Sequence, residues 1–153
     1  MHFIITLLLS TYIYLPGQFM IIHSDLKKDY SLITGPQQKN NPLQESIQRG
    51  QGIYTDFCIQ CHLINGKGDS KNFPPLDGSD WFQNKRLQSI HAVKYGQSGA
   101  IIVNQKKYNN SMPAMGLSNQ EIADVMNYIM NSWSNKQRKM VIAEEVESIK
   151  FQK

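Results

Sequence analysis

The clearest pattern of apolar and polar positions lies near the end of the chain and predicts a helix that begins after Ser118. Ser118 and Glu121 form a capping box, in which the serine side chain accepts from a free helical N–H and the glutamate accepts from the serine N–H. Beyond this cap the apolar residues recur at intervals of three and four, as Ile122, Val125, Met126, Ile129, Met130 and Trp133. This stripe predicts a helix that faces the core, with Met126 and Met130 as packing residues.

A second helix is predicted upstream, from Leu43 to Cys58. Its apolar positions are consistent with one helical face and are Ile47, Ile53, Tyr54 and Phe57. Gly50 lies within this helix, where a glycine costs about 1 kcal/mol relative to alanine. A glycine in such a position usually has a structural reason. Close approach of the helix that follows Ser118 is the best candidate.

The chain between these two helices has mostly loop composition. Gly66–Gly68 and Phe73–Gly78 are rich in glycine and proline, which indicates turns. A shorter helix is predicted from Arg86 to Tyr95, ending at Gly96. Residues 101–108 are predicted to form a short hairpin, which leads into the segment that contains Met112-Pro113.

The N-terminal part of the chain has a different character. Residues 1–23 are mainly apolar and are predicted to be a signal peptide or an N-terminal anchor. The apolar run at 3–15 is shorter than the roughly 20 residues that span a bilayer. An uncleaved anchor over 3–22 is the alternative, although Pro16-Gly17 would interrupt it. Residues 24–43 are polar and predict a flexible linker.

Composition predicts one small domain with extensions. The chain has 153 residues, and its formal charge of +4 is spread along its length. No stripe of clustered basic and aromatic residues is present, so we expect no nucleic-acid partner. The domain is placed at residues 44–134. Residues 135–153 form a polar C-terminal extension, in which residues 143–149 are expected to form at most a helical turn or two.

The two cysteines of the chain both lie in Cys58-Ile59-Gln60-Cys61-His62. The C-x-x-C-H pattern is typical of covalent attachment of a c-type haem. Two thiols three positions apart can form thioether bonds with the two vinyl groups of a porphyrin. The histidine that follows is then held beneath the iron, which a ring nitrogen can ligate. The sequence therefore predicts one covalently attached haem c.

Two other uses of this motif fit less well. A redox-active dithiol relies on a helix N-terminus to lower a thiol pKa, whereas here the helical pattern precedes Cys58. A structural zinc site needs four ligands, commonly in two pairs. The chain has no second C-x-x-C and no pair of histidines at zinc-binding spacing.

The chain resembles the class I cytochrome c family over about residues 44–134. The resemblance rests on ordered pieces and not on the haem motif alone. The family pattern has a glycine, an aromatic residue and the first cysteine at intervals of four, matched by Gly50, Tyr54 and Cys58. Its P-x-L-x-G setting after the haem loop matches Pro74–Gly78, and its methionine before the last helix matches Met112-Pro113.

The resemblance implies an all-α, class I cytochrome c fold of three to five helices around one covalently bound haem. In the family the glycine lets the N-terminal helix cross the C-terminal helix closely, and the partners there correspond to Val125 and Tyr128. The resemblance also implies that the Pro74 carbonyl accepts the second ring N–H of His62, which would fix the orientation of the ring.

The resemblance further implies His62 and Met112 as the axial ligands of the iron. Met112 precedes a proline, which biases it toward an extended conformation and limits motion of the loop. Met115, His91 and an open sixth position remain alternatives. The choice decides the chemistry, because a His/Met pair fills both axial positions and raises the reduction potential.

The leading functional hypothesis is therefore a small electron carrier that is not itself an enzyme and exchanges electrons with redox protein partners. No arrangement of acid, base and nucleophile predicts catalysis. The alternatives are a haem sensor or peroxidase-like domain with a labile sixth ligand, and a cytochrome subunit of a larger oxidoreductase complex. A periplasmic or exported location is expected, with a membrane tether through the N-terminus as an alternative, because bacteria attach covalent haem outside the cytoplasm.

Overall fold

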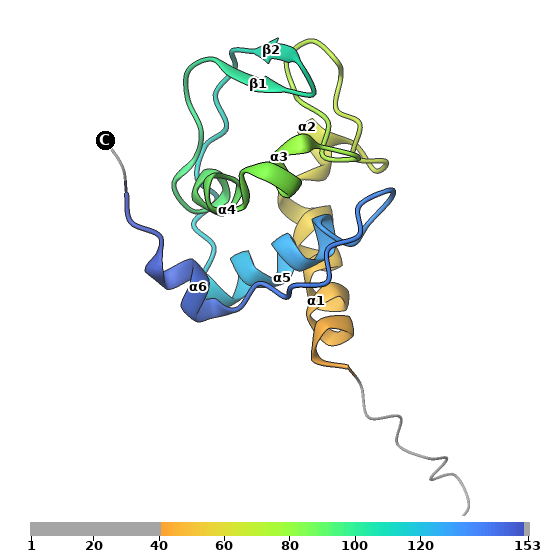
Figure 1. Ribbon diagram of the computed structural model, residues 1–153, viewed down its shortest axis with the longest axis vertical. Coiled ribbons are helices and arrows are strands. Elements are labelled where there is room, and N and C mark those ends of the chain that lie inside the picture. The colour runs from red at the N-terminus through yellow and green to blue at the C-terminus, as the bar shows by residue number, and fades with distance from the viewer. Residues whose placement is uncertain (1–40, 152–153) are drawn as a thin grey trace, which may run out of the picture. The chain divides into compact units, whose positions relative to one another are not determined.

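The computed structural model describes residues 41–151, which are mainly helical (Figure 1). In chain order the elements are α1 (Pro42–Phe57), α2 (Ile59–His62), α3 (Asp80–Asn84), α4 (Arg86–Tyr95), β1 (Ile101–Val103), β2 (Lys106–Tyr108), α5 (Asn119–Ile129) and α6 (Ala143–Ser148). The expected helical fold class is confirmed. The described residues contain six helices and not three to five, because α2 and α3 are short helices for which the apolar periodicity gave no separate signal.

The first helix begins where local sequence signals place it. The Asn41 side chain accepts a hydrogen bond from the N–H of Leu43, and Pro42 occupies the first helical position, where a missing N–H costs nothing. The signal peptide or anchor predicted at residues 1–23 lies outside the described residues, as does most of the predicted linker. Within residues 41–151, no helix is long and apolar enough to cross a membrane.

Helices α1 and α5, which are distant in the sequence, cross and pack against each other (Figure 1). A Cβ atom added at Gly50 would overlap the backbone carbonyl of Asp124 and approach the Tyr128 Cβ to 2.8 Å. The predicted reason for this glycine is thus confirmed. One partner differs from the expectation, because the nearest backbone belongs to Asp124 and not to Val125.

Polar side chains also join α1 and α5 at this crossing. Asp124 is 2% exposed, and its carboxylate accepts hydrogen bonds from Ser46 (2.6 Å), Arg49 (2.7 and 2.9 Å) and Gln120 (3.0 Å). Burial alone would raise the pKa of Asp124. The hydrogen bonds from Arg49, Ser46 and Gln120 together outweigh that effect and hold the pKa below its ordinary value.

The predicted apolar stripe forms the centre of the core from Ile122 to Met130, but α5 ends at Ile129, so Trp133 lies beyond the helix and not on it. The capping box of Ser118 and Glu121 is present, and Met126 and Met130 are both buried, as expected of packing residues. The core combines residues from five helices and from the segments before and after α6, as follows: Tyr54, Phe82, Ile90, Ile122, Ala123, Val125, Met126, Ile129, Met130, Val141, Val146 and Ile149.

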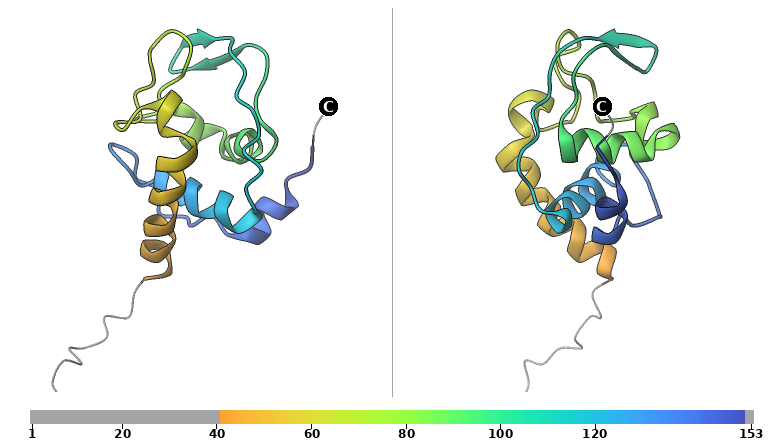
Figure 2. Two further views of the ribbon diagram at one scale, coloured as in Figure 1. Left: turned by 180° about the vertical axis from the view of Figure 1, so that it is seen from behind. Right: turned by 90° about the vertical axis from the view of Figure 1, so that its left-hand side faces the viewer.

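The elements between α2 and α5 lie on one side of α5 (Figure 2). The predicted helix α4 ends at Gly96, whose φ of 83° suits glycine. The predicted hairpin is confirmed, with β1 antiparallel to β2 and both turn residues, Asn104 and Gln105, at positive φ. Asp80 fixes the hairpin to α3, because its carboxylate accepts from Asn104 N–H and its own N–H donates to the Asn104 side chain.

Residues 135–151 are polar in composition, yet they pack against α4 and α5. The apolar residues Val141, Val146 and Ile149 are buried in the core. The last helical turns expected in this segment are present as α6, which Arg86 of α4 holds through a bidentate ion pair with Glu145. This segment is therefore part of the folded structure around α5.

The two glycines of α1 offer a matched test of the helix crossing. Gly50→Ala is expected to destabilise the holoprotein by about 1–3 kcal/mol, because the added methyl group forces α1 and α5 apart. At Gly52 a Cβ would meet nothing within 4 Å. Gly52→Ala is therefore expected to stabilise the protein by about 0.5–1 kcal/mol. Guanidinium denaturation followed by circular dichroism measures both values, and equal effects would contradict the close crossing.

The Asp124 network predicts a pH-dependent contribution to stability. A carboxyl group whose pKa is lower in the folded state stabilises the fold above its unfolded pKa, about 3.9. This contribution is lost as the pH falls through the folded value. We expect Asp124→Asn to lower the free energy of unfolding by about 1–3 kcal/mol at pH 7. The difference from the wild type should shrink below about pH 4.

Asp56→Asn is the control for this prediction, because it removes the same charge from an exposed position on α1. It should change the free energy of unfolding by less than about 0.5 kcal/mol. Denaturation of all three proteins between pH 3 and pH 7 measures the effect. A pH-independent difference between Asp124→Asn and the wild type would show that the charge of Asp124 contributes nothing.

Candidate functional site

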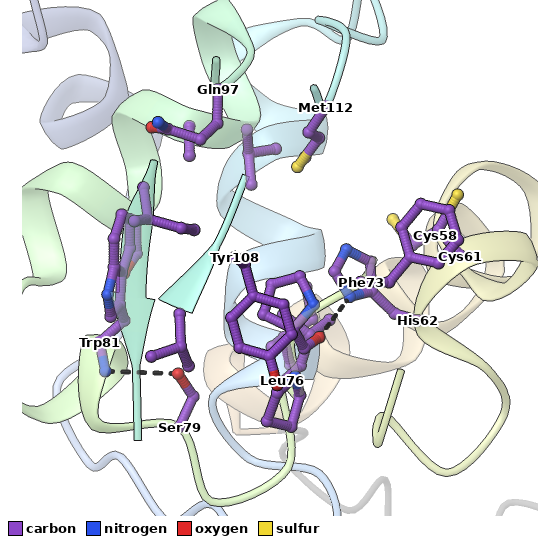
Figure 3. Close-up of a pocket in the computed structure, with 18 of the residues that line it drawn as sticks. Cys58, Cys61, His62, Phe73, Leu76, Ser79, Trp81, Gln97, Tyr108 and Met112 are labelled. Atoms are coloured by element: carbon purple, nitrogen blue, oxygen red, sulfur yellow. Dashed lines mark hydrogen bonds between the residues drawn. The ribbon is translucent and has the colours of Figure 1, made fainter. Parts of the chain in front are cut away.

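An apolar cavity lies between the haem-motif segment, α4, the hairpin and α5 (Figure 3). It encloses about 1190 Å³ of free space, including its mouth toward solvent. None of the described residues that line it is a lysine, arginine, aspartate or glutamate. The floor is the apolar stripe of α5, through Val125, Met126 and Ile129. Such a cavity suits a large, flat and mainly apolar ligand.

Cys58 and Cys61 lie side by side at one end of this cavity (Figure 3). Cys58 follows the last residue of α1 and donates its N–H to the Tyr54 carbonyl, and Cys61 lies one turn later in α2. Neither cysteine forms a disulfide. Burial raises the pKa of Cys58 to about 11, with a further contribution from Cys61. This shift is opposite to the one that a redox-active dithiol requires.

His62 is the last residue of α2 and is 9% exposed. Its Nδ1 lies 3.0 Å from the carbonyl oxygen of Pro74, which can only accept, so Nδ1 carries the proton. Burial lowers the pKa of His62, and the hydrogen bond to Pro74 offsets this only in part. The ring is therefore neutral, and its Nε2 presents a lone pair. Figure 3 shows this second nitrogen directed into the cavity.

The loop that carries Pro74 folds back on the residues just after His62. The Leu76 and Asp77 N–H groups donate to the Gly66 carbonyl at 2.7 and 3.0 Å, and the Gly68 N–H donates to the His62 carbonyl at 3.1 Å. These bonds bring the Pro74 carbonyl beneath the imidazole. The hydrogen bond that the resemblance implied is present in the structure.

Met112 lies across the cavity from His62, and Figure 3 shows its sulfur directed toward the imidazole. Its backbone is fixed by two hydrogen bonds with Gln97, each 2.8 Å long. The sequence reasoning missed Gln97. The one local hint is the glycine next to it. A Cβ at Gly96 would lie 2.7 Å from the Met112 carbonyl oxygen, so a glycine is needed where the two segments meet.

The two other candidate ligands differ in their placement. Met115 also lines the cavity, so it remains close to the site. His91 is not among the lining residues and packs instead against the rings of Tyr95 (5.1 Å) and Phe151 (6.4 Å). His91 is partly exposed at this position.

Aromatic residues complete the wall of the cavity, and the sequence reasoning did not select them. Tyr108 of β2 and Trp81 of α3 both line it. The Trp81 Nε1 donates to the Ile102 carbonyl at 2.8 Å, which fixes the indole against the hairpin. The hairpin lies beside the loop that follows α2 (Figure 1), and residues of both strands line the cavity.

The donor groups of this cavity fit a covalently attached haem. Two thiols stand one helical turn apart, a neutral imidazole presents a lone pair, and a thioether faces it across an apolar space. Thiols, an imidazole nitrogen and a thioether sulfur are the groups by which proteins hold a c-type haem and its iron.

Comparison with known proteins agrees with this geometry. A family model described as cytochrome c matches residues 47–133. Cytochrome c-552 of Thermus thermophilus is 34% identical over 113 residues, which cover 68% of this chain and 86% of that protein. The gluconate 2-dehydrogenase cytochrome c subunit of Pantoea cypripedii is 32% identical over 114 residues, covering 69% of this chain and 25% of that protein.

A further relative is the cbb3-type cytochrome c oxidase subunit FixP of Bradyrhizobium diazoefficiens, 30% identical over 110 residues, which cover 69% of this chain and 33% of that protein. The family match spans the helix crossing, both cysteines, His62 and the segment with Met112. The chain therefore belongs to the cytochrome c family and carries one covalently attached haem c.

Proposed function

We propose that this protein is an electron carrier in which His62 and Met112 ligate the haem iron from opposite sides. The observation that supports this most strongly is the arrangement of the two side chains. The unprotonated nitrogen of His62 and the sulfur of Met112 face each other across one apolar cavity. When bound, the haem supplies an iron that alternates between two oxidation states.

The residues of the chain hold and shield this group. Cys58 and Cys61 anchor one edge, and the hydrogen bond to Pro74 keeps the Nε2 of His62 available as a ligand. The apolar lining excludes water, which limits rearrangement of polar groups when the charge changes. With Met112 in the sixth position, no place remains for a small substrate. Among the described residues, the lining also holds no carboxylate or amine for acid–base catalysis.

The mouth of the cavity supports exchange with protein partners. Phe57 lines the cavity and is 43% exposed, and the neighbouring Cys61 is also exposed. The attached edge of the haem would therefore lie at the surface, where electrons can pass directly to another protein. The donor and the acceptor are proposed to be redox proteins.

Several relatives are named as subunits of larger enzymes, namely cytochrome c subunits of gluconate 2-dehydrogenase and of alcohol dehydrogenase (quinone), and a subunit of a cbb3-type cytochrome c oxidase. This chain covers only 22–33% of those proteins. As an alternative, we therefore propose that this protein transfers electrons as part of such a complex or next to one. We also propose export through residues 1–23, with retention of that segment as a membrane anchor as the alternative.

Replacing each of the two methionines of the cavity in turn tests which one ligates the iron. Met112→Ala is expected to abolish the sulfur-to-iron charge-transfer band of the oxidised protein and to lower its reduction potential, because a thioether favours reduced iron. Met115→Ala is the matched control, since it removes the same side chain from the same segment. It should keep the band. Visible spectra and redox titration measure both, and the reverse result would assign Met115 as the ligand.

A filled sixth position also predicts weak reactivity toward diatomic ligands. The reduced wild-type protein is expected not to bind carbon monoxide within minutes at neutral pH, whereas reduced Met112→Ala should bind it readily. The change of the Soret band on addition of the gas measures binding. Rapid binding by the wild type would instead support a haem sensor or a peroxidase-like domain.

A further inference from the structure

Trp133, Ser134 and Asn135, three consecutive residues after α5, are here called the 133–135 clip. They form hydrogen bonds with the beginning and the end of the loop between α2 and α3, which carries Pro74. The Trp133 Nε1 donates to the Ile64 carbonyl at 3.1 Å. The Ser134 N–H donates to the carboxylate of Asp77 at 3.0 Å, and its hydroxyl donates to the same oxygen. The chain after α5 thus lies against the loop between α2 and α3 (Figure 1).

Asn135 makes the central connections of the clip. It is 8% exposed, and its side-chain NH2 donates to the carbonyls of Leu76 (2.8 Å) and Ile129 (2.9 Å). Its side-chain oxygen accepts from the Gly78 N–H at 3.0 Å. Both amide hydrogens and the oxygen are used. Because Ile129 is the last residue of α5, this one side chain fixes the loop to the end of that helix.

The connection from Asn135 to the Pro74 carbonyl is short and stiff. Leu76 is held on both sides, because its carbonyl accepts from Asn135 and its N–H donates to Gly66. Only Pro75 separates Leu76 from Pro74. Both prolines have a fixed φ, so the chain between the clip and the Pro74 carbonyl has few free torsions. A displacement of Leu76 therefore moves that carbonyl.

We propose that Asn135 is a positioning residue for His62, and that it acts by fixing the Pro74 carbonyl that accepts the Nδ1 proton. This hydrogen bond sets the orientation of a histidine ligand and raises its basicity. Weakening it makes the imidazole a poorer donor to the iron and favours the reduced state. The inference rests on the proposed function, since it requires His62 to ligate the haem iron.

Asn127 is a matched control for this role. It is 1% exposed and makes the same number of side-chain hydrogen bonds as Asn135. Its NH2 donates to Ser46 and to the Val141 carbonyl, both at 2.8 Å, and its oxygen accepts from the Val141 N–H at 2.7 Å. These bonds join α5 to Ser46 of α1 and to the chain before α6, and they do not reach the loop of Pro74. Replacing either asparagine should therefore lower the stability, whereas only the replacement of Asn135 should affect His62.

The experiment compares the holoproteins of the wild type, Asn135→Ala and Asn127→Ala. Reduction potentials come from redox titration, and the state of His62 comes from the hyperfine-shifted NMR signals of its ring in the oxidised protein. Both variants are expected to unfold at lower denaturant concentration. Only Asn135→Ala should have a more positive potential and shifted His62 signals, while its sulfur-to-iron charge-transfer band remains.

The proposal would be overturned if Asn135→Ala kept the reduction potential and the His62 signals of the wild type. It would also be overturned if Asn127→Ala changed both by the same amount. Asn135→Asp is measured by the same criterion if the alanine variant does not accumulate, because it keeps the oxygen for Gly78 but loses both N–H donors. A wild-type protein without hyperfine-shifted His62 signals would instead overturn the proposed function, and this inference with it.

Discussion

The close crossing of α1 and α5 at Gly50 is the constraint on which the rest of the structure depends. A side chain at this position would separate the two helices, and the polar network of Asp124 would lose its partners on α1. The crossing places the end of α1, and with it Cys58, beside the apolar stripe of α5. One glycine thus determines the distance between the haem attachment segment and the floor of the cavity.

The cavity is held by contacts that are distant in sequence. The Pro74 loop reaches back to Gly66, and the backbone of Met112 pairs with Gln97. Met112 and the Pro74 carbonyl, which accepts from His62, therefore both sit on loops that are pinned by backbone hydrogen bonds. A site of this kind keeps its geometry when the charge of the iron changes, because the surrounding polar groups are already paired.

The chain after α5 links stability to the chemistry of the site. Its apolar residues Val141 and Val146 complete the core, while the 133–135 clip fastens the loop that carries Pro74. These two tasks are divided between two buried asparagines, Asn127 and Asn135, which make similar hydrogen bonds in different places. The position of His62 thus depends on residues more than 60 positions away in the sequence.

The sequence by itself determined what depends on neighbouring residues. Three local patterns were informative because each depends on only a few neighbouring residues. The Cys58–His62 motif predicted the haem, the capping box at Ser118 predicted a helix start, and Gly50 predicted a close helix contact. Only the tertiary structure decided that Asp124 meets Gly50, that Gln97 fixes Met112 and that Asn135 fixes the Pro74 loop. Such pairings join residues that no local pattern relates, because they arise when the core closes.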